Sequence, residues 1–386
     1  MGHLLRLIAL LALAVALLPA AATVAAAPAA PATPVDGLAA SVRDQYIITL
    51  KPGVSAKAFA QGNGIATTYV YDKALNGFTA KLNLRQLAAL KRNPAVLRVE
   101  ADQVVQAAPR SGSGGASIQA IPWNLDRIDQ QFLPLSGSYT TASQGQSANV
   151  YVIDTGIQTT NAQFSGRAFV AYDTFGGNGQ DCHGNGTYIA GVVGGTTYGV
   201  AKQARLWSVR ALNCTGAGTT SGILNAINWV TANHQPRAIA VIAFGSPNSS
   251  TVNTAVANMI AANVFTAVAA SSSGDACNFT PGSVATAMTT AASNAADQAV
   301  GGSGPCIDIY APGANVQGPS LTGVVTRSGT TPAAAHVAGV AALYKATYGE
   351  QPSATVTSGI ISTATVGVLT GVPPSTVNRL LYTAGL

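Results

Sequence analysis

From residue 149 onward, the sequence alternates short, β-prone apolar runs with longer stretches that have helical spacing. The strand-like runs are residues 149–157, 205–212, 238–244, 264–270 and 307–313, and the helix-like runs are 187–195, 221–234, 251–264 and 332–349. Strands that alternate with helices predict a parallel sheet covered by helices on both faces. Functional groups gather at the carboxyl ends of such strands. We therefore expect a site where Asp154 ends one strand and where Asn185 and Thr331 each stand just before a helix.

The residues before this region follow a different pattern. Residues 45–108 read as strand, helix, two strands, helix, strand, which predicts a small α+β domain over residues 43–107. A positive start, a short apolar core and a small-residue exit predict a secretory signal peptide over residues 1–27. A Pro/Ala linker (28–42) and a Gly/Ser linker (108–117) flank the small domain, and the larger domain is expected over residues 118–386.

The net charge of +6 does not indicate a polyanionic partner. Up to Ser117 there are eleven Lys and Arg against five Asp and Glu, whereas beyond it there are nine against nine. The excess therefore lies in the leader and the small domain. The larger domain is near neutral, so we expect no nucleic-acid partner and no membrane partner.

The four cysteines indicate disulfides, because export implies an oxidising compartment. They are Cys182, Cys214, Cys277 and Cys306, and their number alone allows three pairings. No two of them have a C-x-x-C spacing, which argues against a metal cluster.

Several long motifs in order then resemble a known family. The small domain contains "QYIITLKPG", "ALNGFTAKL" and "VEADQVV", and the larger one "VYVIDTGI", "DCHGNGTYIAG", "RALNCTGAGTTSG", "CIDIYAPG" and "SGTTPAAAHVAGVAALY". These resemble the proteinase K-like branch of the subtilases, which are secreted serine endopeptidases made with an inhibitor-type propeptide. The resemblance implies a subtilisin-like three-layer α/β domain preceded by a small α+β propeptide domain. It also implies a monomer that binds its own propeptide, and disulfides Cys182–Cys214 and Cys277–Cys306.

The family's catalytic positions fall on residues of unexpected type. The carboxylate position is Asp154, the histidine position is Asn185, the serine position is Thr331 and the oxyanion asparagine matches Ser272 most closely. An amide has no usable basicity near neutral pH, so Asn185 cannot deprotonate an alcohol. Asn185 can instead donate its amide N–H to the Asp154 carboxylate.

Two neighbouring residues bear on whether the chemistry survives. Pro332 disfavours the α conformation for Thr331, which is expected to re-aim its hydroxyl. His183 is interpreted as an exposed loop residue that points away from Asp154, and His3, His234 and His336 as leader, loop and helix-packing residues. We expect a secreted pseudoprotease that binds peptides or proteins. The alternative is an active endopeptidase that uses a variant site centred on Thr331.

The resemblance implies two further sites. Substrate peptides in the family add as a strand to a glycine-rich edge opposite a second wall, and these positions are Gly216, Ala217 and Gly218, and Ala243, Phe244 and Gly245. Phe244 is bulkier than the family's usual leucine and is expected to narrow the first specificity pocket. A structural Ca²⁺ ion is expected at the Asp308 carboxylate with the carbonyls of Ala285 and Ala287. No catalytic cofactor is expected.

Overall fold

The computed structural model describes residues 41–107, 121–271 and 274–386. The predicted signal peptide, the linker over residues 108–117 and Ser272 lie outside the described residues, as does all but the end of the 28–42 linker. Among the helices that are described, none is both long enough and apolar enough to cross a membrane.

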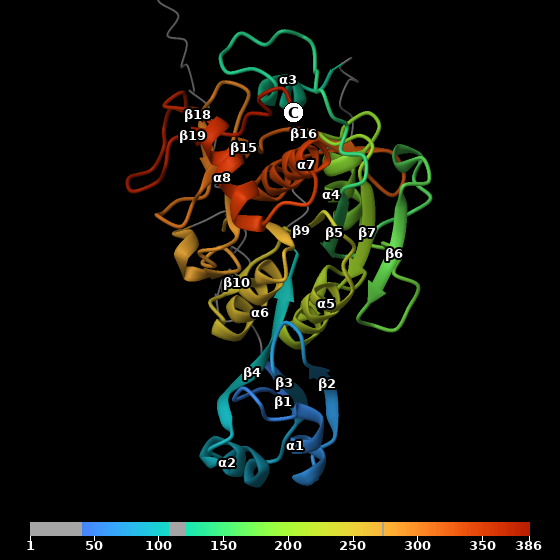
Figure 1. The fold of residues 1–386 in the computed structure, drawn as a ribbon, viewed down its shortest axis with the longest axis vertical. Helices are drawn as coiled ribbons and strands as arrows, with labels where there is room; N and C mark the ends of the chain where they lie inside the picture. The colour runs from blue at the N-terminus through green and yellow to red at the C-terminus, as the bar shows by residue number, and fades with distance from the viewer. Residues whose placement is uncertain (1–40, 108–120, 272–273) are drawn as a thin grey trace, which may run out of the picture. The chain divides into compact units, whose positions relative to one another are not determined.

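The N-terminal domain is an antiparallel sheet with two helices, as its sequence pattern predicts (Figure 1). Its strands lie in the order β2-β3-β1-β4, and its elements are β1 (Ser41–Leu50), α1 (Ala56–Gly62), β2 (Thr67–Tyr71), β3 (Gly77–Lys81), α2 (Leu84–Arg92) and β4 (Val96–Gln106). Asn83 begins α2 with a capping box completed by Gln86. Apolar side chains of both helices and the sheet, including Ile48, Phe78 and Leu90, form a separate small core.

The C-terminal domain is built on a ten-stranded sheet, ordered β18-β19-β15-β13-β11-β9-β5-β7-β6 with β14 paired to β13. From β6 to β19 the neighbouring strands are parallel. The strands are β5 (Asn149–Asp154), β6 (Ala168–Asp173), β7 (Arg205–Arg210), β9 (Ala238–Ile242), β11 (Phe265–Ala269), β13 (Met288–Ser293), β14 (Ala299–Gly301), β15 (Ile309–Pro312), β18 (Thr365–Val366) and β19 (Arg379–Leu380). All five predicted strands are present, and the structure adds β6, β13 and β19 to the parallel set.

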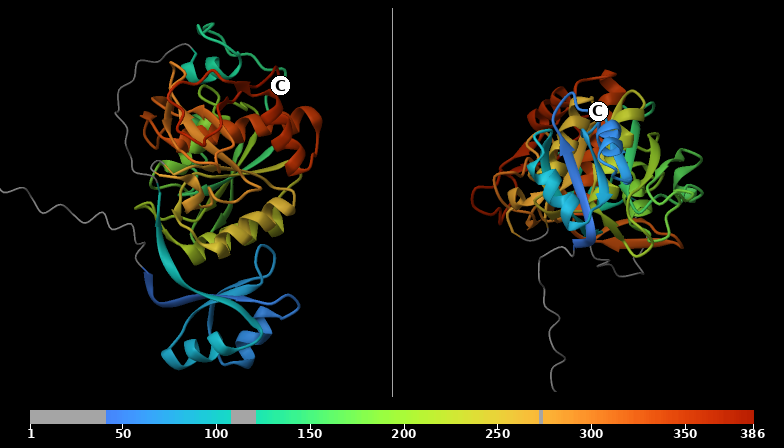
Figure 2. Two further views of the ribbon diagram at one scale, coloured as in Figure 1. Left: turned by 90° about the vertical axis from the view of Figure 1, so that its left-hand side faces the viewer. Right: turned by 90° about the horizontal axis from the view of Figure 1, so that it is seen from below.

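Helices cover both faces of this sheet, which confirms the predicted three-layer α/β fold (Figure 2). Along β5, Val150 and Val152 belong to one core with residues of α4, α7 and α8, whereas Tyr151 and Ile153 belong to a second core with residues of α5 and α6. This alternation follows from the two-residue period of a strand. The helices are α4 (Asn185–Gly194), α5 (Thr220–Asn233), α6 (Ser250–Ala261), α7 (Thr330–Tyr348) and α8 (Ser353–Thr363).

Short elements complete the domain. They are the helix α3 (Trp123–Ile128), the 3₁₀ helices η1 (Ala162–Phe164) and η2 (Ala276–Asn278), the strand β8 (Ala217–Thr219), the pair β10 (Ser246–Pro247) and β12 (Phe279–Thr280), and the hairpin of β16 (Val316–Pro319) and β17 (Val324–Arg327). The hairpin packs on α4, where the Tyr188 hydroxyl donates to the Val316 carbonyl at 3.0 Å.

The two domains meet through β4, which pairs with β8 as well as with β1. The buried carboxylate of Asp102 on β4 accepts hydrogen bonds from the Ser221 N–H at 2.9 Å and the Ser221 hydroxyl at 2.6 Å. Ser221 lies in the first turn of α5, where backbone N–H groups have no helical partner and a negative charge is stabilised. This contact anchors the last strand of the N-terminal domain beside the start of α5.

Candidate active site

Three of the four predicted catalytic positions lie at the carboxyl edge of the sheet. Asp154 ends β5, Asn185 is the first residue of α4, and Thr331 lies in the first turn of α7. Ser272, the fourth, lies outside the described residues. The tertiary fold therefore places side chains that are up to 177 positions apart in the sequence on adjoining elements.

The Asp154 carboxylate is fully buried and is held by the residue at the histidine position. Nδ2 of Asn185 donates to both carboxylate oxygens, at 3.0 and 3.1 Å, and the Thr155 N–H donates to Oδ1 at 2.8 Å. This is the Asn185 contact expected from the sequence. Burial raises the pKa of Asp154 to about 6, and the hydrogen bonds from Thr155 and Asn185 limit that rise.

Arg327, which the sequence analysis did not single out, completes this network. Its Nη1 donates to Oδ1 of Asn185 and its Nη2 donates to the Gly184 carbonyl at 3.3 Å. Its guanidinium also lies 4.8 Å from the centroid of the Tyr188 ring. A guanidinium only donates and a carboxylate only accepts, so Asn185 must direct its nitrogen to Asp154 and its oxygen to Arg327. The amide thus bridges a buried carboxylate and a buried guanidinium.

This arrangement positions charge but provides no base at residue 185. The Thr331 hydroxyl donates to the Ala243 carbonyl at 3.1 Å, and no hydrogen bond joins Thr331 to Asn185, both of which the structure describes. An amide does not have the basicity to take a hydroxyl proton near neutral pH, and both polar atoms of this amide already have partners.

The expectation that Pro332 keeps Thr331 out of the α conformation is wrong. The helix α7 begins at Thr330 and includes both Thr331 and Pro332. The first four N–H groups of a helix have no intrahelical acceptor, so a proline in the first turn removes no hydrogen bond. Burial of this end of α7 among the core residues outweighs the local preference of a residue that precedes proline.

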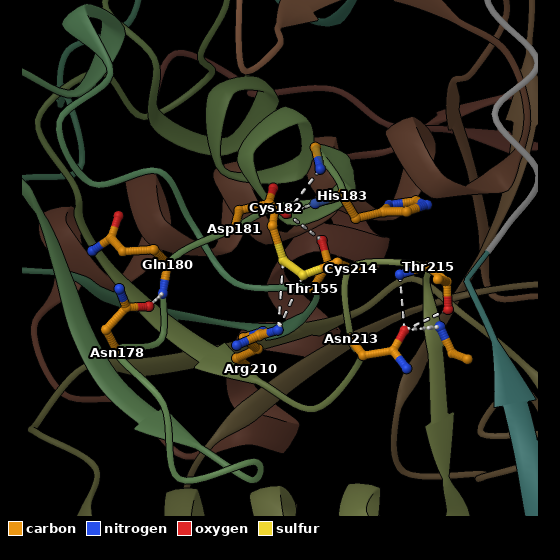
Figure 3. The surroundings of a disulfide bond; sticks show 12 residues. Thr155, Asn178, Gln180, Asp181, Cys182, His183, Arg210, Asn213, Cys214 and Thr215 are labelled. Atoms are coloured by element: carbon orange, nitrogen blue, oxygen red, sulfur yellow. Dashed lines mark hydrogen bonds between the residues drawn. A yellow bond between two sulfur atoms is a disulfide. The ribbon is translucent and has the colours of Figure 1, made fainter.

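The interpretation of His183 as an exposed residue is also wrong, although its ring does turn away from the Asp154 side. The side chain is buried, with the residue only 8% exposed. Figure 3 shows the ring directed away from Thr155, the neighbour of Asp154. A Cβ placed on Gly216 would lie 2.9 Å from Nε2 of His183, so the imidazole lies against the glycine edge. The absence of a side chain at Gly216 leaves room for the imidazole of His183. The imidazole packs there and is buried rather than exposed to solvent.

The glycine edge carries a strand of the protein's own N-terminal domain. β4 pairs antiparallel with β8, in the register Val104 with Thr219, Val105 with Gly218 and Gln106 with Ala217. The ladder continues where the Ala107 N–H donates to the Gly216 carbonyl at 2.7 Å. The edge predicted to bind peptide as an added strand therefore has a peptide strand on it.

The opposite wall contributes an apolar pocket for this strand. Val105 is 2% exposed and packs in one core with Phe244, Ile223 and Ile242. Phe244 thus lines the pocket that receives Val105. Ala243 supplies the carbonyl that accepts from Thr331, and Gly245 precedes the short strand β10. The residues after Ala107 lie outside the described part of the chain, so narrowing of the first specificity pocket by Phe244 stays a prediction.

Both disulfides implied by the resemblance are present, Cys182–Cys214 and Cys277–Cys306. The first joins the loop before α4 to the turn before Gly216 (Figure 3). Nη2 of Arg210 lies 3.5 Å from both of its sulfur atoms. This cross-link ties the loop that bears His183, which leads into α4 at Asn185, to the peptide-binding edge.

Of the predicted calcium residues, Asp308 supplies the carboxylate, and the ion itself stays a prediction. Oδ2 of Asp308 accepts the Thr289 N–H at 2.7 Å, and burial raises the pKa of Asp308 to about 6. A cation at the second carboxylate oxygen would offset that cost of burial. Among the described residues, no group of three or more His, Cys, Asp and Glu side chains could hold a metal ion. Asp308 with the carbonyls of Ala285 and Ala287 is compatible with a calcium ion held mainly by oxygen atoms of the main chain and water.

Comparison with known proteins identifies the family. The model of the subtilase family matches residues 145–381, and the model described as peptidase inhibitor I9 matches residues 45–108. The chain therefore belongs to the subtilase family, with an inhibitor-type prodomain ahead of its peptidase domain.

Individual relatives agree with this membership. The chain is 40% identical over 329 residues to the "Extracellular serine proteinase" of Thermus sp. (strain Rt41A), covering 83% of this chain and 78% of the relative. It is 36% identical to the "Cuticle-degrading protease" of Metarhizium anisopliae, covering 88% and 90% of the two chains. Among solved structures, a cold adapted subtilisin-like serine proteinase superposes with a TM-score of 0.67 at 36% identity, covering 68% of this chain and 98% of that one.

Proposed function

We propose that this subtilase is an exported pseudoprotease, which holds a peptide strand in its cleft without cutting it. The observation that carries the proposal is the side chain of Asn185, whose nitrogen donates to Asp154 and whose oxygen accepts from Arg327. Acyl transfer by a hydroxyl nucleophile needs a base that takes its proton. The residue at the histidine position has no such capacity, and both of its polar atoms are engaged.

The peptide-binding edge β8 and the apolar pocket beside it are both retained, and they support a binding role. β8 still offers main-chain hydrogen bonds to an added strand, and the pocket around Val105 still selects an apolar side chain. Affinity from the backbone ladder and selectivity from pockets do not require the catalytic groups. The ligand we propose is an extended peptide segment, with the chain's own prodomain as its first occupant. Export is supported by the predicted signal peptide and by a relative named as an extracellular proteinase.

The second candidate is an endopeptidase that uses a variant site centred on Thr331. The comparisons support it better than they support loss of activity, because the relatives they identify are named as proteases. This candidate needs a base for the Thr331 hydroxyl. His336 is fully buried with both ring nitrogens in contacts, to the Pro332 carbonyl and to Asn124, and His234 is at the far end of α5. Of the described imidazoles, His183 lies nearest to the peptide edge.

A hydrolysis assay with a matched control separates the two candidates. The full chain, secreted from a host without extracellular proteases, is incubated with casein and with short chromogenic peptides beside its Thr331→Ala variant. We expect both proteins to give the same background and both to keep the prodomain, with an N-terminus near Pro28. Hydrolysis that Thr331→Ala abolishes, or a self-generated N-terminus near Ile118, would establish the endopeptidase instead.

We further propose a structural calcium ion at Asp308, with the carbonyls of Ala285 and Ala287. The raised pKa of the Asp308 carboxyl supports this, because a bound cation would compensate for its burial. The ion would stabilise the fold and take no part in chemistry.

A further inference from the structure

The imidazole of His183 forms part of the peptide-binding edge, and the proposed function gives it no role. A Cβ placed on Gly216 would lie 2.9 Å from Nε2 and 3.3 Å from Cδ2 of His183. The same point lies 3.3 Å from Cβ of Ala107, the residue of the bound strand that pairs with Gly216. The ring and the bound methyl group therefore border one small space beside the glycine.

The loop that bears His183 is held rigidly in this position. Oδ1 of Asp181 accepts the N–H groups of His183 and Gly184, each at 2.8 Å, and Oδ2 accepts the Thr187 N–H at 2.9 Å. The adjacent disulfide, Cys182–Cys214, ties the loop to the turn before Gly216 (Figure 3). Moving the backbone of this loop away from the edge would require several of these bonds to break.

The turn on the other side of the space is fixed as well. Oδ1 of Asn213 accepts the N–H groups of Thr215 and Ala217, at 2.9 and 3.0 Å, and the Gly216 N–H donates to the Asn213 carbonyl at 2.9 Å. Neither the backbone that carries the ring nor the turn can shift easily to admit a larger ligand side chain.

The register of the bound strand shows which ligand residue meets the ring. Side chains alternate along a strand, so Ala107 lies on the same face as Val105, which is in the apolar pocket, and Gln106 faces the other way. Val105 and Ala107 stand opposite Gly218 and Gly216, which have no side chains. Ala107 has only a methyl group to place beside the imidazole.

We propose that His183 is a specificity-determining residue, which restricts the ligand residue opposite Gly216 to a small side chain. This inference rests on the proposed function, and it names the peptides that the cleft accepts. They have an aliphatic residue at the position of Val105 and glycine, alanine or serine two positions later. A leucine at the second position would have to occupy the volume of the ring, and overpacking of this kind weakens docking.

Hydrogen exchange on the full chain tests the proposal, because the bound strand is part of the same molecule. Exchange of the backbone amides in residues 104–107 and 216–219 is followed by mass spectrometry in four variants. Ala107→Leu should raise exchange in both segments about tenfold or more. His183→Ala alone supplies the baseline for the comparison, and the double variant should recover the protection of that baseline. Gln106→Leu is the matched control, because its exposed side chain faces away from the ring, and it should change nothing.

Two results would overturn the proposal. One is protection in Ala107→Leu equal to that of the unsubstituted chain, and the other is failure of His183→Ala to restore protection to Ala107→Leu. An Ala107→Val variant, which should give a smaller effect of the same sign, covers the case in which the leucine variant does not fold. Failure of the proposed function itself would look different, since the unsubstituted chain would then hydrolyse casein or cut its own linker near Ile118, whatever the exchange of residues 104–107.

Discussion

Arg327 is expected to oppose any attempt to restore proteolysis at this site. The starting variant carries Asn185→His, Thr331→Ser and Ser272→Asn, which supply the family's base, nucleophile and oxyanion donor. Thr331 already lies in the helix α7, so Pro332 does not have to be replaced. We predict that this variant cleaves its own linker very slowly and that the same variant with Arg327→Gln cleaves it much faster.

The magnitude follows from the position of the guanidinium. Nη1 of Arg327 is within hydrogen-bond distance of the side chain at residue 185. A unit charge about 4 Å from an imidazole, at an effective dielectric constant of about 20, opposes its protonation by about 4 kcal/mol. This corresponds to a depression of the histidine pKa by about 3 units, and to about 10³-fold in a step that needs the imidazolium. The carboxylate of Asp154 offsets part of this effect, so we expect a difference of roughly 10²- to 10³-fold.

The assay is the first-order rate at which the linker between the two domains is cut, followed by gel electrophoresis and N-terminal sequencing. Intramolecular cleavage is the most sensitive readout, because the effective concentration of the linker is high. Thr331→Ala in the repaired background controls for contaminating proteases, and Arg327→Gln in the unsubstituted chain should leave the linker intact. Equal cleavage rates with and without Arg327 would refute the electrostatic argument.

Three further predictions concern stability. Burial lowers the pKa of His336 to about 4, so between pH 6.5 and pH 4 the unfolded chain binds a proton that the folded chain does not. The contribution of His336 should therefore be complete above pH 6.5 and fall by up to about 3 kcal/mol towards pH 4, and thermal unfolding of the unsubstituted chain and His336→Gln should converge as the pH falls. Replacing Cys182 and Cys214 by serine should lower the free energy of unfolding by roughly 4 kcal/mol, as urea titration would measure, since the loop spans 32 residues. EDTA should lower the melting temperature of the unsubstituted chain but not of Asp308→Ala, and equal shifts would contradict a calcium ion at Asp308.

The periodicity of apolar residues along the sequence was sufficient to predict the architecture of the larger domain. The alternation of β-prone and helical runs predicted a parallel sheet covered on both faces, because periodicity reports directly which side of an element is buried. The contact between Asn185 and Asp154 was expected from the family resemblance, which places these residues at the histidine and carboxylate positions. The pairing of the cysteines came from family resemblance, because four cysteines alone allow three connectivities.

The chemical state of the site depended on contacts that no local pattern encodes. Arg327 donates to Asn185, which lies 142 positions earlier in the chain. No motif in the sequence marks this arginine as part of the site. His183 reads as an exposed loop residue, yet its side chain is buried and lies against the glycine edge. Pro332 reads as a helix boundary, yet core packing holds it inside the first turn of α7. The sequence determines which faces are apolar and which motifs occur in which order. Only the tertiary structure decides which polar groups meet in the interior, because there each buried donor and charge requires a partner that is remote along the chain.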